Sequence, residues 1–126
     1  MAVAGSTHVL RMIPAVLAGA VAAFALTPDI ARAEILRGQA SFYGHPGVTA
    51  NGEVFRPDDM TAAHRTLPFG ARVRVTDVRT RRSIVVRIND RGPFIAGRII
   101  DVSRGAAEVL GMTSRGVAAV EIEVVN

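Results

Sequence analysis

Glycine and proline interrupt residues 34–126 about every eight to twelve positions, and this spacing limits the fold more than any other feature of the sequence. Turn-forming clusters lie at residues 44–47, 51–52, 56–59 and 67–70. The segments between them are too short for typical helices, but each can hold a strand of about four to eight residues. The spacing therefore predicts an all-β domain built from many short strands.

The segments between the turns show the two-residue period of strands. We expect strands at Gly38–Tyr43, within Met60–His64, at Arg72–Val78, Ser83–Asn89 and Arg98–Val102, and after Gly116. In the last of these, Val120, Ile122 and Val124 should face the core, and the glutamates between them should face solvent. The strand Ser83–Asn89 is apolar enough to be buried on both faces.

One short helix is predicted before the last strand, because Ser103 can cap its first turn and Gly111 can end it. Residues 73–77 and 86–90 resemble one another, either as a pseudo-repeat of two barrel halves or as a chance similarity of strands. Many short strands and one helix favour a small closed barrel. Closure leaves no unpaired strand edge, and it needs no disulfide in a chain without cysteine.

The first 33 residues have the three-part layout of a secretory signal peptide. A positive charge at Arg11 precedes the apolar run Met12–Leu26, and Ala31-Arg32-Ala33 fits the cleavage pattern. The alternative is an uncleaved membrane anchor, but the run is shorter than the roughly 18–20 residues that span a bilayer. We expect cleavage after Ala33, a single barrel domain at residues 34–126, and a periplasmic or secreted protein.

The charge balance suggests an anionic partner, with 15 basic residues, all arginine, against 11 acidic ones. Arginine binds carboxylates and phosphates bidentately, which suits a cell-wall polymer, although ordinary solvated surface charge is the preferred explanation of the surplus. Export argues against nucleic acid. No cofactor motif is present, and three histidines without cysteine give too few ligands for a metal site. We expect a monomer without metal or cofactor.

Three side chains are candidates for chemistry. Glu53 follows the Asn51-Gly52 turn and adjoins Val54 and Phe55, so apolar surroundings should raise its pKa and suit it to act as a general acid. The alternative is a solvated turn glutamate. His64 is either a site histidine or a structural one inside the barrel. Asp90 ends the most apolar strand, and is either catalytic or the cap of the turn that follows it.

A resemblance to a known family joins these residues. The segments that carry it are, in order, Gly38–Gly44, Thr49–Phe55, Thr61–Gly70, Val85–Phe94 and Gly97–Ser103. In sequence and spacing they resemble the rare lipoprotein A family. The resemblance implies a six-stranded double-psi β-barrel, a fold shared with expansins and barwin-like proteins.

The resemblance also implies an activity. Members of the family include septal lytic transglycosylases, which cleave the bond from N-acetylmuramic acid to N-acetylglucosamine without adding water. They leave an anhydro-muramic end and favour strands stripped of stem peptides. The family's catalytic acid falls on Glu53, its barrel aspartate on Asp90 and its site histidine on His64. The chain is therefore predicted to be an endolytic peptidoglycan transglycosylase.

In the mechanism that we hypothesise, Glu53 protonates the glycosidic oxygen and the sugar's own primary hydroxyl attacks. Asp90 stabilises the developing positive charge or orients the substrate, and His64 holds one of the carboxylates. Tyr43, Asn51 and Arg91 are the expected sugar contacts.

The sequence departs from the family at residue 56, which is arginine where members often carry an aspartate. Asp58 or Asp59 is the possible substitute, whereas Arg56 could pair with Glu53 and lower its pKa. The rival hypothesis is therefore a non-catalytic, expansin-like module that binds wall glycan. An ionised Glu53 held by a guanidinium would favour that rival.

Overall fold

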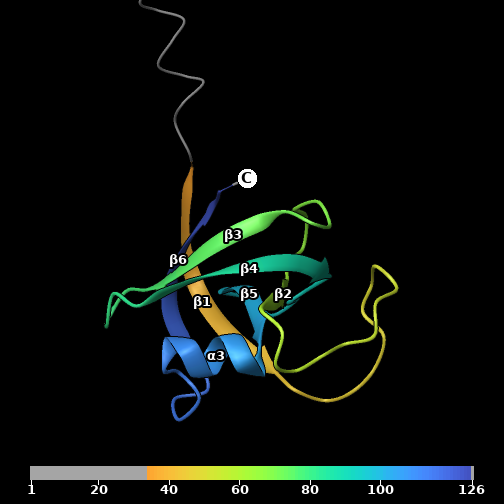
Figure 1. Ribbon diagram of the computed structural model, residues 1–126. Coiled ribbons are helices and arrows are strands. Elements are labelled where there is room, and N and C mark those ends of the chain that lie inside the picture. The colour runs from red at the N-terminus through yellow and green to blue at the C-terminus, as the bar shows by residue number, and fades with distance from the viewer. Residues whose placement is uncertain (1–33, 126) are drawn as a thin grey trace, which may run out of the picture. The chain divides into compact units, whose positions relative to one another are not determined.

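The computed structural model describes residues 34–125, which form a closed six-stranded barrel with one short helix (Figure 1). The elements are β1 Ile35–Tyr43, β2 Thr61–Ala63, β3 Arg72–Asp77, β4 Ser83–Asp90, β5 Arg98–Ser103, α3 Arg104–Leu110 and β6 Ala118–Val124. Around the barrel the strands follow the order β1-β5-β2-β4-β3-β6. The predicted fold class and all six predicted strands are confirmed, with boundaries that differ by a few residues.

Two strand pairs are parallel, β1 with β5 and β2 with β4, and the remaining neighbours are antiparallel. The register shifts within both parallel pairs, so that Ile99 on β5 and Asn89 on β4 are extra residues. A β-bulge of this kind bends its strand and redirects the neighbouring side chains. The bulge at Asn89 lies where β4 ends, next to Asp90.

The core fills the barrel with inward residues of every strand and one face of α3. Its fully buried members include Val73, Val75, Val86, Ile88, Ile100, Val102, Val120, Leu110 and Met112. The predicted alternation in the last strand is confirmed at Val120 and Ile122. The expectation for Val124 is wrong, because this residue is 42% exposed at the end of β6, beyond the packed layers.

Helix α3 has the predicted caps. The Ser103 hydroxyl accepts a hydrogen bond from the backbone N–H of Ala106, and Gly111 ends the helix in the left-handed conformation, with φ of 74°. In residues 34–125 no helix is long and apolar enough to cross a membrane. The predicted signal peptide, residues 1–33, lies outside the described residues.

A buried ion pair between Asp77 and Arg115 links the β3–β4 hairpin to the segment that leads into β6. One oxygen of Asp77 accepts the backbone N–H groups of Arg79 (2.8 Å) and Thr80 (3.2 Å). The other accepts Arg115 at 2.6 Å. Asp77 is 0% exposed, so its charge depends on these donors. Burial by itself would raise the pKa of Asp77, but the hydrogen bonds from Arg115, Arg79 and Thr80 outweigh it and lower the pKa.

We predict that Asp77→Asn lowers the free energy of unfolding at neutral pH by about 3 kcal/mol, because Arg115 then lacks its charged partner. A carboxyl whose pKa is lower in the folded state stabilises the fold at any pH above its pKa in the unfolded chain. This stabilisation is lost as the pH falls through the pKa of the folded state. The difference between wild type and variant should therefore shrink below about pH 4. Urea unfolding across pH measures it.

The matched control is Arg37→Gln, which removes a solvent-exposed ion pair with Glu121. Its cost should stay below about 1 kcal/mol. Equal costs for the two variants would contradict the structural importance of the buried pair.

Candidate active site

The end of β4 presents the side chains of the candidate site. Val86 and Ile88 face the core, so the alternating residues Arg87 and Asn89 face outward. Asp90 follows the bulge and pairs in register with Ala63 of β2. Three polar groups of β4, the Arg87 guanidinium, the Asn89 amide and the Asp90 carboxylate, therefore lie together at one rim of the barrel.

A hairpin at residues 47–55 lies against this rim. Val48 and Val54 form an antiparallel bridge, and Gly52 turns the chain with φ of 94°, as the Asn-Gly pair predicts. The backbone N–H of Asn51 donates to the Asn89 carbonyl (3.2 Å), and that of Ala50 donates to the Asp90 carboxylate (2.9 Å). Backbone contacts to β4 thus fix the tip of the hairpin that carries Glu53.

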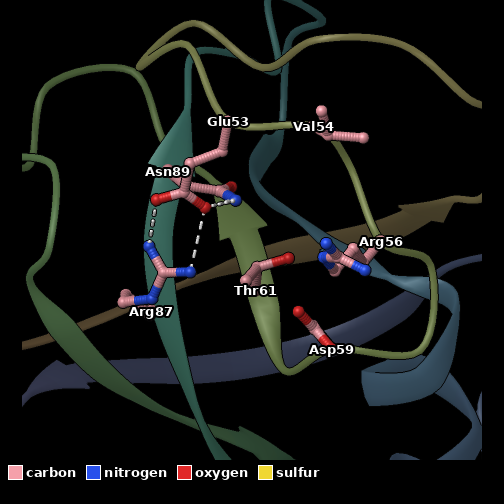
Figure 2. A pocket seen from close by; sticks show the side chains of 7 residues that line it. All are labelled: Glu53, Val54, Arg56, Asp59, Thr61, Arg87 and Asn89. Atoms are coloured by element: carbon pink, nitrogen blue, oxygen red, sulfur yellow. Dashed lines mark hydrogen bonds and ion pairs between the residues drawn. The ribbon is translucent and has the colours of Figure 1, made fainter.

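The Glu53 carboxylate receives four side-chain hydrogen bonds. Arg87 donates bidentately to it, as the dashed lines in Figure 2 show. The two N–O distances are 2.7 and 2.9 Å. Asn51 donates at 2.8 Å and Asn89 at 3.1 Å. The Glu53 side chain is 38% exposed and that of Arg87 42% exposed, so both remain open to a ligand.

The pKa of Glu53 is lowered to about 2 by the hydrogen bonds from Arg87, Asn51 and Asn89, in that order. The expectation of a raised pKa is therefore wrong. Its apolar neighbours do not cover the carboxyl, because Val54 is exposed and Phe55 packs against Tyr43. Arg87, and not Arg56, is the arginine that binds the Glu53 carboxylate.

Asp90 lies in different surroundings. Its Oδ1 accepts the backbone N–H groups of Ala50 and Arg91, each at 2.9 Å. The Tyr43 hydroxyl donates to its Oδ2 at 3.4 Å, and the Tyr43 ring stacks on Phe55 with centroids 4.7 Å apart. Burial, and then the Asp90 charge, raise the pKa of Tyr43, so the phenol stays protonated. Tyr43 and Asp90 line two pockets with aromatic walls.

His64 and Arg91 build the loop at residues 64–69. Nδ1 of the buried imidazole accepts the backbone N–H groups of Thr66 and Leu67, both at 3.1 Å. Arg91 donates to the carbonyls of His64 and Leu67, and its guanidinium lies 3.9 Å over the Phe69 ring.

Burial first, and then Arg65 and Arg91, lower the pKa of His64, so its ring is neutral at pH 7. The expectation that this ring holds a carboxylate is corrected, because its hydrogen bonds within residues 34–125 go to backbone amides. The backbone N–H of His64 does donate to the Asp90 carbonyl, at 3.2 Å. His64 therefore supports the site through the main chain.

Helix α3 holds the turn at residues 56–59. The Ser103 hydroxyl donates to the Asp59 carbonyl (2.5 Å), and the backbone N–H of Gly105 donates to the Pro57 carbonyl (2.8 Å). A Cβ on Gly105 would lie 2.7 Å from the Asp58 carbonyl oxygen, so this approach requires glycine. Asp58 pairs with Arg104 at the surface, whereas Asp59 lines the pocket that contains Glu53.

That pocket has a volume of about 330 Å³. It is lined by Glu53, Val54, Arg56, Asp59, Thr61, Arg87 and Asn89 (Figure 2). Two buried polar atoms at this pocket, Thr61 Oγ1 and Asn89 Oδ1, have no hydrogen-bond partner among the described residues. Residues 34–125 contain no group of three or more histidines and carboxylates placed to hold a metal ion.

Comparison with known proteins defines the class of this barrel. A Streptomyces papain inhibitor matches with a TM-score of 0.63 at 23% identity, over 74% of this chain and 96% of that one. An expansin from Clavibacter michiganensis matches with a TM-score of 0.59 at 20% identity, over 74% of this chain and 51% of that one. Both likenesses concern the fold, which is the double-psi β-barrel.

The sequence comparisons define the family. The model of the lytic transglycolase family matches residues 35–122, so the chain belongs to that family. A Nostoc protein named "Probable endolytic peptidoglycan transglycosylase RlpA" is 63% identical over 95 residues, 71% of this chain and 26% of the relative. The "Endolytic peptidoglycan transglycosylase RlpA" of Pseudomonas aeruginosa is 49% identical over 96 residues, 74% of this chain and 28% of the relative. The match thus spans between a quarter and a third of these curated relatives.

We predict that an NMR titration of the Glu53 side-chain carboxyl gives a pKa of about 2. In Arg87→Gln the pKa should rise by about 1 or more, because the main donor to the charged form is lost. Arg56→Gln is the control, since Arg56 makes no ion pair with Glu53. A larger rise in Arg56→Gln than in Arg87→Gln would contradict the assignment of the partner.

Proposed function

We propose that this barrel is an endolytic peptidoglycan transglycosylase that cleaves the linkage from N-acetylmuramic acid to N-acetylglucosamine in glycan strands. The observation that carries the proposal is the pair of carboxylates that the end of β4 and its hairpin bring to one rim. Glu53 is held by Arg87 and Asn89, and Asp90 lies beside Tyr43. Family membership and the names of the relatives support the same reaction.

In the proposed mechanism Glu53 gives its proton to the glycosidic oxygen, and the bond from that oxygen to the anomeric carbon of muramic acid breaks. The primary hydroxyl of the same sugar forms a new bond to this carbon and returns a proton to Glu53. The products are a free N-acetylglucosamine hydroxyl and a 1,6-anhydro-muramic end, so no water is consumed. One carboxyl thus acts in turn as acid and base.

Asp90 has the second role in this mechanism. Its carboxylate lies in pockets lined by aromatic rings, where a negative charge stabilises positive charge developing on the sugar. Tyr43 lines both pockets and is the best placed of the three expected sugar contacts. Asn51 and Arg91 are bound to Glu53 and to the 64–69 loop, so they act chiefly as positioning residues.

The second candidate function is a non-catalytic module that binds wall glycan. It is favoured by the ionised state of Glu53, which in this arrangement cannot donate a proton at neutral pH. Catalysis by Glu53 therefore requires that its contact with Arg87 be replaced when substrate binds. Under either function we propose that the protein acts on peptidoglycan glycan outside the cytoplasm, after removal of residues 1–33 and as a monomer.

The test is digestion of peptide-stripped glycan with mass spectrometry of the products. Wild type should release fragments with anhydro-muramic ends, and Glu53→Gln should reduce their rate of formation about 100-fold or more. Asp90→Asn should also reduce it, whereas Glu123→Gln, on an exposed pair with Arg74, should not.

Sedimentation with purified sacculi separates the two candidates. A transglycosylase should bind and release product, and Glu53→Gln should still sediment with the sacculi. Wild type that sediments but releases no anhydro product would establish the binding module instead. Equal product from wild type and Glu53→Gln would remove Glu53 from the mechanism.

A further inference from the structure

Two guanidinium groups line the pocket beside Glu53, and they differ in whether a carboxylate pairs with them. Arg87 already holds a carboxylate, that of Glu53, in bidentate geometry. Arg56 lines the same pocket, and among the described residues no carboxylate pairs with it. The pocket therefore already contains one arginine–carboxylate contact, and Arg56 supplies a second cation that can bind the same carboxylate.

The pocket also contains polar atoms that need a partner. Thr61 is 4% exposed and Asn89 is 2% exposed, and neither Thr61 Oγ1 nor Asn89 Oδ1 has a hydrogen-bond partner within residues 34–125. A buried polar atom without a partner is costly, by about 1–3 kcal/mol. A hydroxyl acts as donor or acceptor and an amide oxygen as acceptor, so either atom would bind a sugar hydroxyl once a side-chain movement opens it to the pocket.

We propose that Arg56 and Arg87 form a subsite for the lactyl carboxylate of a muramic acid residue, and that this carboxylate exchanges with Glu53 on Arg87. The choice of polymer rests on the proposed function. Among the sugars of peptidoglycan glycan, muramic acid alone carries a carboxylate. The subsite would thus distinguish the two alternating sugars and set the position of the strand.

The exchange is energetically accessible, because one carboxylate replaces another and Arg87 keeps an anionic partner. Both members of the present pair are about two-fifths exposed, so water screens their attraction and can hydrate each group during the exchange. After Glu53 leaves, two guanidinium groups face the charge of Asp59 alone. The vacated pair thus attracts an anion.

The exchange also supplies what the proposed mechanism lacks. Once separated from Arg87, Glu53 loses the largest cause of its lowered pKa. Enclosure beside the sugar then raises the pKa further, towards the range of a general acid. A stem peptide would abolish the exchange, because amide formation removes the lactyl charge. Strands that carry peptides would therefore leave Glu53 ionised.

The first test is binding without catalysis. We would titrate the protein with N-acetylmuramic acid and follow the guanidinium Nε–H resonances of Arg56 and Arg87 by NMR. Both resonances should shift, and N-acetylglucosamine at the same concentration should shift neither. Equal shifts with the two sugars, or no shift with N-acetylmuramic acid at any attainable concentration, would overturn the subsite.

The second test uses peptide-stripped glycan whose lactyl carboxyls have been reduced to alcohols. Wild type should lose about tenfold or more in kcat/KM on the reduced glycan, the loss expected for one charge-assisted contact. Arg56→Gln should lose a similar factor on native glycan and little more on reduced glycan. Arg79→Gln, an exposed arginine of the β3–β4 hairpin, is the matched control and should behave as wild type on both.

The outcomes separate the two proposals. Failure of wild type to cleave native glycan, together with the selective NMR shifts, would refute the proposed function and leave the carboxylate subsite standing. Equal cleavage of native and reduced glycan would refute the subsite and leave the transglycosylase standing. An equal loss in Arg56→Gln on both glycans would show that Arg56 acts without the lactyl carboxylate, which also overturns the subsite.

Discussion

The contact between Glu53 and Arg87 is the interaction on which the rest of the site depends. It joins the 47–55 hairpin to β4 by side chains, in addition to the backbone bonds that reach Asn89 and Asp90. The same contact keeps the principal candidate for proton donation ionised. In this arrangement Glu53 is held in position but ionised. Proton donation by Glu53 therefore requires a ligand that replaces its carboxylate on Arg87. A partly exposed pair suits this purpose, since an incoming carboxylate can reach Arg87 from solvent.

Two strands with similar sequences end in aspartates that differ in burial. Asp77 ends β3 and accepts two backbone amides of the turn that follows it, whereas Asp90 ends β4 and accepts one amide from the next residue and one from the 47–55 hairpin. Arg115 completes the contacts of Asp77, which is wholly buried. Asp90 has instead a long hydrogen bond from Tyr43 and lines two pockets. Residues 73–77 and 86–90, which resemble one another in sequence, thus both lead to an aspartate that accepts backbone amides, but of the two aspartates Asp90 is the one that lines pockets.

The strands and the helix were predictable because their signals are local. Alternation identified Val73 and Val75, and capping residues identified α3. The partners of Glu53 were not predicted, because they depend on which strand the 47–55 hairpin lies against. Alternation places Arg87 and Asn89 on one outward face, but no local pattern brings a carboxylate from 34 residues earlier in the chain to that face. The raised pKa expected from Val54 and Phe55 was wrong for the same reason, since neighbours in sequence did not become neighbours of the carboxyl.

Arg56, the residue that departs from the family pattern, lines the pocket beside Glu53 and changes its charge. An aspartate at this position would face Asp59 and Glu53 across a pocket whose remaining cation, Arg87, is already occupied. An arginine there reverses the local charge and changes what the pocket can bind, while Asp59 retains a carboxylate nearby. Because α3 holds the turn at residues 56–59 through Ser103 and Gly105, both charges are fixed to the barrel rather than to the hairpin. The pocket can therefore keep its shape while Glu53 leaves it, which is the condition that an exchange of carboxylates requires.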